Sequence, residues 1–230
     1  ANKKKQPALI LKTNGATYSI LDRETCLEKI RNVKKMFPSD WKLPNVYLLH
    51  GSFTDEEMNY LYNHPKVKCM VSLTHGEGFG RPLLEATMTG LPIIVSGWSG
   101  HLDFVDEENS ILLGGELKQI PKSLVWKDIL VEESKWFITD ENQTYKALNY
   151  AFTNQNEIKN KAKKLEFKNR GKFTLNKMIE KLDEIMEKSV GNIPSQVQLN
   201  LPKLKKSDTN ISELKLPKLK KLTNNTEVSV

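Results

Sequence analysis

The chain is poor in cysteine and has no long hydrophobic run. Its two cysteines, Cys26 and Cys69, are too few for a disulfide framework and do not follow a metal-binding spacing. We expect both to be reduced, buried thiols of a cytoplasmic protein. No apolar stretch approaches the roughly 20 residues that span a bilayer, and the basic N-terminus lacks the apolar core of a signal peptide. The sequence therefore predicts no transmembrane segment.

Hydrophobic residues are scarce too, at 38%, and the mean hydropathy is −0.50. Both values are low for a globular domain. The formal net charge of +7 lies at the two ends, in residues 1–5 and 191–230, whereas residues 6–190 carry equal numbers of acidic and basic side chains. A basic protein can bind nucleic acid, but the lysines here are not interleaved with aromatic residues. The composition therefore argues against specific nucleic-acid binding.

Residues 191–230 differ in pattern from the rest of the chain. The hexapeptide LPKLKK occurs twice, at 201–206 and 216–221, and each copy contains a proline. Each is too short to bury a core, so we expect a disordered tail. Two interpretations stay open: the tail is only solvated, or its repeats bind an acidic partner or an anionic membrane surface. With residues 1–6 as a short basic extension, residues 7–190 are the expected folded domain.

Short apolar runs alternate with helical segments in residues 7–190. Strands are expected at 8–12, 45–50, 67–73, 93–95 and 111–113. Helices are expected at 23–36 with Asp22 as cap, after the capping box at 54–57, and at 82–89, 99–105, 140–152, 156–166 and 174–189. Residues 114–138 are less regular, with Pro121, Trp126 and Trp136. This alternation indicates an α/β fold, with a Rossmann-like parallel sheet covered by helices on both faces and a helical C-terminal section.

The carboxyl ends of four expected strands carry polar or glycine residues. These are Lys12, His50-Gly51, His75-Gly76-Glu77 and Ser96-Gly97-Trp98. Ligands of parallel sheets bind beyond the carboxyl ends of the strands. We therefore expect one binding site there.

Residues 75–86, HGEGFGRPLLEA, are the most informative segment. Residues 76–80, which we name the glycine turn, follow a buried strand and precede Pro82, a residue suited to the first turn of a helix. A strand, a glycine turn and a helix N-terminus together can bind phosphate. Glu77 and Glu85 add two carboxylates, with seven residues between them, that suit sugar hydroxyls. The expected ligand has both phosphate and sugar.

Residues 77–85 resemble the group 1 glycosyltransferases, a family of retaining enzymes with the GT-B fold. The family pattern E-G-F-G-x-x-x-x-E, then G-x-P-(V/I)-(V/I), then a G-x-x-E-like turn, appears here at 77–85, 90–94 and 100–103. The likeness runs from about residue 7 to about residue 189. It implies one Rossmann-like half of a GT-B fold, which binds a nucleotide diphosphate sugar for transfer to an acceptor hydroxyl with retention.

The resemblance assigns two residues to catalysis. Glu77 is expected to contact the donor sugar beside the anomeric centre, and Lys12 to neutralise the diphosphate as it leaves. Glu85 is expected to bind the ribose hydroxyls. The family generally works without a bound metal, and the chain has no Asp-x-Asp pattern, so no metal or other cofactor is expected.

Further residues are expected around the ligand. Those implied to bind the donor sugar and diphosphate are Gly78, Phe79, Gly80 and Arg81. Those implied to lie near the base or the sugar are Gly51, Ser52 and His101, with Asp103 beside His101 where the family more often has glutamate. The family's second basic residue after the first loop is missing, and Arg23 is a candidate substitute.

Simpler interpretations stay open for several of these residues. Glu85 could be an ordinary first-turn helix carboxylate, Glu77 a cap, and Lys12 a solvated strand end. His75 could be a loop histidine without a catalytic role, and Arg81 a surface residue.

A GT-B enzyme needs a second Rossmann-like domain, which carries the acceptor site, and residues 1–6 are too short to form it. We expect the chain alone to bind nucleotide but to transfer sugar poorly. The alternative function is a non-catalytic nucleotide-sugar-binding or scaffold module whose basic tail recruits partners.

Overall fold

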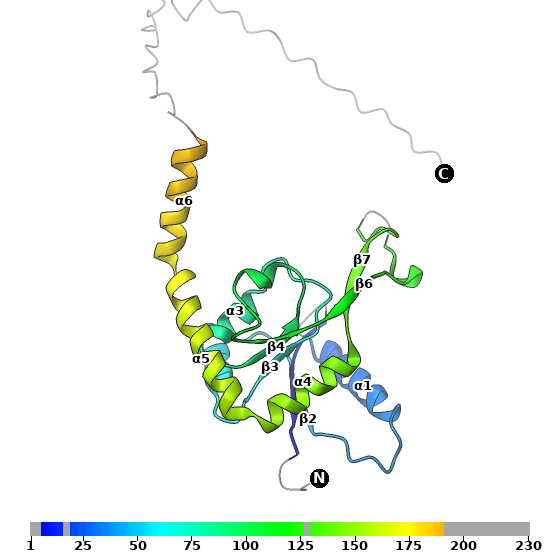
Figure 1. The fold of residues 1–230 in the computed structure, drawn as a ribbon. Coiled ribbons are helices and arrows are strands. Elements are labelled where there is room, and N and C mark those ends of the chain that lie inside the picture. The colour runs from blue at the N-terminus through cyan, green and yellow to red at the C-terminus, as the bar shows by residue number, and fades with distance from the viewer. Residues whose placement is uncertain (1–5, 16–18, 127–128, 191–230) are drawn as a thin grey trace, which may run out of the picture. The chain divides into compact units, whose positions relative to one another are not determined.

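Strands and helices alternate along the chain in the computed structural model, which describes residues 6–15, 19–126 and 129–190 (Figure 1). The strands are β1 (Leu9–Lys12), β2 (Val46–Leu49), β3 (Met70–Ser72), β4 (Ile93–Ser96), β5 (Ile111–Leu113), β6 (Gly115–Gln119) and β7 (Lys135–Thr139). The α-helices are α1 (Ile20–Lys35), α2 (Asp55–Asn63), α3 (Arg81–Met88), α4 (Glu141–Thr153), α5 (Gln155–Lys172) and α6 (Leu175–Ser189). Two short 3₁₀ turns are η2 (Gly100–Asp103) and η3 (Lys122–Leu124).

The first five strands are all paired in parallel, which confirms the predicted α/β class. They form two sheets rather than the single sheet that the sequence predicts. β1 pairs with β2, with Leu9 opposite Val46, and β4 lies between β3 and β5, with Ile94 opposite Val71. Within the described residues no ladder joins the two sheets.

An antiparallel ribbon follows the parallel strands. β6 and β7 pair from Gly115 opposite Thr139 to Gln119 opposite Lys135 (Figure 1). Because the sequence of residues 114–138 is less regular, no strand was predicted there, and the prediction missed these two strands. The ribbon bears on the site because it contacts the loops at the ends of β3 and β4.

Local capping chemistry starts helices α1, α2 and α4, and the sequence predicts the right capping residue in two of them. The Thr54 hydroxyl accepts a hydrogen bond from the Glu57 backbone and the Glu57 carboxylate accepts one from Thr54 N, so the predicted capping box is confirmed. Asp140 caps α4 as expected. The prediction for α1 was wrong, because Ser19 is its cap and Asp22 lies inside the first turn.

The main core lies around β4, whose four residues are all buried. α3 contributes Leu83 and Ala86, and α5 contributes Leu165. Asn169 of α5 is fully buried, and its side-chain amide donates to Thr87 Oγ1 at 2.8 Å and to the Phe104 carbonyl at 3.0 Å. These contacts join α5 to α3 and to the loop after β4, and they support the glycine turn that leads into α3.

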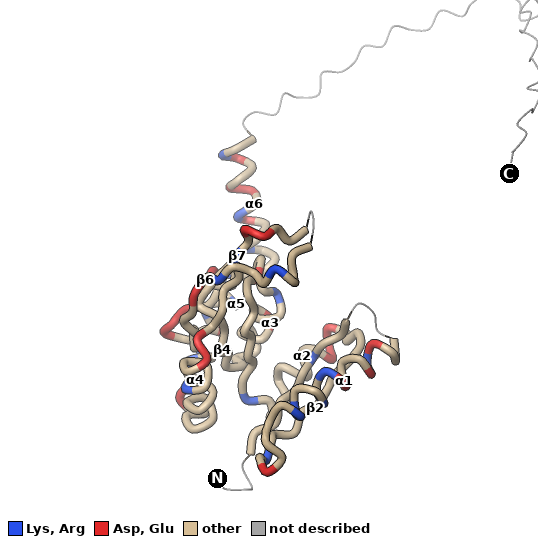
Figure 2. The backbone as a smooth tube through the Cα atoms, turned by 90° about the vertical axis from the view of Figure 1, so that its right-hand side faces the viewer, with Lys and Arg blue, Asp and Glu red and all other residues tan. Residues whose placement is uncertain are grey.

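The C-terminal part of the described chain is helical, as expected. One compact unit extends to Asp183, and a second comprises Glu184–Val230, of which residues 184–190 are described. The predicted basic tail at 191–230, with both LPKLKK repeats, and residues 1–5 of the predicted extension lie outside the described residues. Both signs of charge occur along α1 and along α6 (Figure 2). None of the described helices has the length and apolar character to cross a membrane.

Candidate functional site

The glycine turn is held by hydrogen bonds to the loop after β4. The Ser99 hydroxyl accepts from Glu77 N at 3.0 Å and donates to the Glu77 carbonyl at 2.7 Å, and Gly100 N donates to the same carbonyl at 3.0 Å. A Cβ atom on Gly100 would overlap the Gly78 carbonyl oxygen. The two loops therefore meet backbone to backbone, as only glycine allows.

Ser99 adopts a backbone conformation that glycine normally occupies. Its φ is 92° and its ψ is −170°. Such a conformation costs on the order of 1–3 kcal/mol in a residue with a side chain. The two hydrogen bonds to Glu77 are the contacts that hold Ser99 there.

Gly80 ends the turn and caps α3 in a left-handed conformation, with a φ of 85°. Side chains of His101, Leu83 and Phe104 surround the position that a Cβ atom would take, so the space favours glycine as well. Within the described residues, the backbone N–H groups of residues 78–81 have no hydrogen-bond acceptor. A Cβ on Gly78 would meet nothing within 4 Å. The turn thus presents unpaired donors at a helix N-terminus, which suits an anion.

The two carboxylates of the segment have different surroundings. Among the described residues no side chain pairs with the Glu77 carboxylate. The Glu85 carboxylate forms an ion pair with Arg81 at 2.8 Å, one helical turn away. Arg81 was expected among the phosphate-binding residues, and in this structure its guanidinium lies against Glu85.

Tyr62 lies close to Glu85. Burial, together with the negative charge of Glu85, raises the pKa of Tyr62 to about 12. Its hydroxyl is buried and makes no hydrogen bond of standard geometry within the described part of the chain, although the Glu85 carboxylate lies close enough to act on it. The Glu85 carboxylate, which is expected to bind ribose, therefore has the positive charge of Arg81 and the uncharged hydroxyl of Tyr62 as neighbours.

Aromatic residues join the β6–β7 ribbon to the site. The His75 ring stacks on Trp136 with centroids 4.6 Å apart, and its Nδ1 lies 2.9 Å from the Phe137 carbonyl. Trp98 stacks on Phe137 at 6.0 Å. These contacts give His75 a structural role beside the glycine turn, and the sequence pattern of residues 114–138 did not reveal them.

Phe79 lies on the other side of the turn. Its ring contacts Phe104 at 5.3 Å and Phe173 at 6.2 Å, and the side chain remains 42% exposed. Phe79 therefore anchors the turn to the core while one part of its ring stays accessible.

Lys12 lies at the carboxyl end of β1 but is not free. Its ammonium group donates to the Gly51 carbonyl at 2.8 Å and lies 4.8 Å from the centre of the Phe53 ring. The structure therefore places Lys12 with Gly51, next to Ser52, as the sequence predicts for neighbouring strand ends. Arg23, the candidate second basic residue, pairs with Glu24 on the surface of α1.

His101 was expected near the base or the sugar and is fully buried. Its Nε2 lies 2.7 Å from the Ser96 carbonyl. Neither His101 Nδ1 nor Ser96 Oγ has a hydrogen-bond partner among the described residues. The Cβ atom of His101 lies 3.2 Å from the position that a Cβ atom on Gly80 would take, so His101 packs beneath the end of the glycine turn. Asp103 is exposed at the end of η2.

Residues 40–149 match the family of glycosyl transferases group 1. Among solved structures, sucrose-phosphate synthase from Thermosynechococcus elongatus is similar, with a TM-score of 0.53 and 15% sequence identity. That likeness covers 78% of this chain and 38% of the other, and it supports the expected GT-B-like fold. No curated protein matches the chain by sequence. The matched residues include the glycine turn, both carboxylates and the serine that holds the turn, so residues 40–149 are similar to the group 1 glycosyltransferases over the part of the chain that carries the candidate site.

Proposed function

We propose that this domain binds the nucleotide diphosphate sugar of a retaining glycosyltransferase, with the diphosphate and sugar at the glycine turn. The observation that carries the proposal is the row of backbone N–H groups in residues 78–81, which have no acceptor among the described residues and lie at the start of α3. Backbone N–H groups at a helix N-terminus bind phosphate through hydrogen bonds and the helix dipole. Open space beside Gly78 supports a ligand approaching there.

The two carboxylates then divide between two sets of hydroxyls. A carboxylate repels phosphate but accepts hydrogen bonds from hydroxyls, so Glu77 is assigned to the donor sugar and Glu85 to the ribose. A hydrogen bond to a charged group contributes about 1.5–3 kcal/mol, which is enough to orient the sugar. Lys12 offers a positive charge to the leaving diphosphate after releasing the Gly51 carbonyl. In this proposal the transfer step needs no metal.

We propose further that the acceptor site belongs to polypeptide beyond these residues. The chain covers 38% of the similar sucrose-phosphate synthase. The two parallel sheets also have edges without a ladder partner in the described chain, and apolar residues of the edge strands β1 and β3 are exposed, among them Leu9, Ile10 and Val71. A second Rossmann-like domain, which the GT-B resemblance implies, is the proposed source of the missing surface.

The first experiment is a calorimetric titration of the chain with UDP, GDP and ADP. One of the three is expected to bind, and Glu85→Gln is expected to weaken that binding at least about tenfold, through loss of a charged hydrogen-bond acceptor. Glu157→Gln is the matched control, because Glu157 makes the same type of ion pair with Lys161, at 3.3 Å, on α5. Binding of none of the three nucleotides, or equal weakening by both variants, would contradict the proposal.

The second experiment separates an enzyme from a binding module. In a longer protein that includes the acceptor domain, Glu77→Ala is expected to lower turnover by more than about tenfold, with nucleoside diphosphate affinity largely kept, because Glu77 contacts only the sugar. Unchanged turnover would remove Glu77 from catalysis. Nucleotide binding without any turnover in the parent protein would favour the non-catalytic module.

A further inference from the structure

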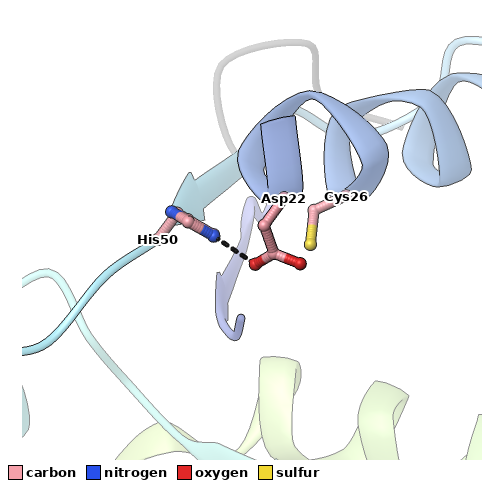
Figure 3. A group of neighbouring side chains, drawn as sticks. All are labelled: Asp22, Cys26 and His50. Atoms are coloured by element: carbon pink, nitrogen blue, oxygen red, sulfur yellow. Dashed lines mark hydrogen bonds and ion pairs between the residues drawn. The ribbon is translucent and has the colours of Figure 1, made fainter. Parts of the chain in front are cut away.

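Three side chains with different ligand chemistry meet between α1 and the end of β2. Asp22 and Cys26 lie one turn apart on α1, and His50 follows β2 directly. Figure 3 shows all three pointing into the same space. One ligand atom from each lies within 4.8 Å of the other two, and His50 Nε2 is 2.7 Å from Asp22 Oδ2.

We propose that Asp22, Cys26 and His50 bind a Zn²⁺ ion. Thiolate sulfur, imidazole nitrogen and carboxylate oxygen are the ligands that zinc takes in proteins, at about 2.0–2.3 Å. Tetrahedral ligands at that range are separated by about 3.3–3.8 Å, so small side-chain movements from the present arrangement complete three of the four positions. The site uses no residue of the glycine turn.

The proton balance of binding is simple. The Cys26 thiol releases its proton to solvent and binds as thiolate. His50 binds through Nε2, so the ring carries its hydrogen on Nδ1, and the His50–Asp22 hydrogen bond is replaced by two metal bonds. The Asp22 carboxylate also accepts a hydrogen bond from Gly15 N at 2.7 Å, which helps to hold this side chain in place.

A metal ion bound at this cluster would stabilise the contact between α1 and β2. No residue of α1 is buried, and neither β1 nor β2 contains a buried residue. Hydrophobic packing therefore does little to fix α1 to β2, and a metal that bridges Asp22 and Cys26 to His50 would join them directly. The His50–Asp22 pair, with side chains 5% and 13% exposed, already connects the same elements and preorganises two of the ligands.

The chain offers a matched control for the cysteine. Cys69 is the other thiol, and burial raises its pKa to about 12, which leaves it protonated and a poor ligand. Among the described residues, Cys69 belongs to no cluster of three metal-ligating side chains. Replacing Cys69 therefore tests for a general effect of losing a thiol.

The experiment titrates the full chain with Zn²⁺ alone, by calorimetry, and with Co²⁺, by absorption spectroscopy. We expect one ion per chain and a sulfur-to-cobalt charge-transfer band. Cys26→Ser is expected to abolish the band and weaken Zn²⁺ binding at least about tenfold, whereas Cys69→Ser leaves both unchanged. Absence of stoichiometric binding, or an unchanged Zn²⁺ affinity in Cys26→Ser, would overturn the proposal.

A second readout guards against misfolded variants. Hydrogen exchange of the parent chain with and without Zn²⁺ needs no substitution. Slower exchange in α1 and at the end of β2, with β4 unchanged, is the expected result. Protection spread evenly over the chain, or none, would contradict a site made by these three residues.

Discussion

All four residues of β4 are buried, whereas β1, α1 and β2 contain no buried residue. The first region has helices α3 and α5 packed against each other, and the Asn169 side chain of α5 donates a hydrogen bond to Thr87 of α3. The second exposes large apolar side chains, including Ile20 and Leu21 at 79% each. The two regions have similar strands and helices, so the difference lies in what covers them.

The residues of the proposed site are divided between these two regions. The glycine turn stands on the buried region and is fixed by Ser99, Gly100 and the aromatic contacts of the β6–β7 ribbon. Lys12 and Gly51 stand on the exposed region. We infer that the glycine turn, the proposed diphosphate site, is preorganised in this chain, whereas the Lys12 side of the proposed site depends on further packing.

The largest expected effect compares one leucine from each region. Leu165→Ala, in the buried region, should lower the free energy of unfolding by about 3 kcal/mol, because Leu165 is 1% exposed and the substitution leaves a cavity. Leu9→Ala, at a residue 45% exposed, should cost less than about 1 kcal/mol. Urea denaturation measures both free energies of unfolding. Similar losses in the two variants would contradict a difference in packing between the two regions.

The next effect concerns the contact between the two loops. Gly100→Ala should cost about 2 kcal/mol, because its methyl group would overlap the Gly78 carbonyl and force the loops apart. It should also weaken nucleotide binding. Gly78→Ala is the control, with nothing within 4 Å of the new methyl group, and its stability should stay near that of the parent. If the two alanine variants were equally stable, the loops would not be tightly joined.

A smaller effect is expected from the serine hydroxyl. Ser99→Ala should cost about 1 kcal/mol, since it removes two hydrogen bonds to the Glu77 backbone and keeps the unfavourable backbone conformation. Ser99→Gly should recover part of that loss by relieving the backbone. Thermal unfolding of the pair checks this order. An alanine variant more stable than the glycine variant would show that the strain is unimportant.

The smallest effect lies in the exposed region and depends on pH. The hydrogen bonds that Asp22 makes with His50 and Gly15 hold the pKa of its carboxyl group below the ordinary 3.8. The charged form of Asp22 therefore stabilises the fold above about pH 4. This contribution is lost as the pH falls through the lowered pKa. Asp22→Asn should therefore destabilise the chain at neutral pH, and the difference should shrink in acid. Asp40→Asn, at an exposed position, is the control, and a pH-independent difference would contradict this account.

Much of the fold was predictable, because the parallel strands are short apolar runs with clear polar ends. The capping boxes and glycines also give local signals, and Thr54, Gly80 and Asp140 lie where those signals indicate. The β6–β7 ribbon was not predictable in this way. All five residues of β6 are exposed, so β6 has no buried apolar face that a pattern could reveal. Its partner β7 is also separated from it in sequence by a segment that contains Pro121.

The local geometry of the candidate site was predictable where residues close in sequence form it. Residues 77–85 lie together as one turn and one helix start, so their order alone reveals them. Contacts between distant residues were not visible. His50 pairs with Asp22 across 28 residues, and Trp136 stacks on His75 from a strand that the sequence did not predict. Such contacts depend on packing, which a single sequence does not report.

The most direct test of the account is hydrogen exchange of the full chain with and without the nucleoside diphosphate that binds it. Protection should be concentrated in the amides of residues 78–81, which have no acceptor among the described residues, with little change in β4, whose amides are already paired. Protection of those four residues by the nucleotide would support a diphosphate site at the glycine turn. Binding that leaves their exchange unchanged, and protects another segment, would contradict it.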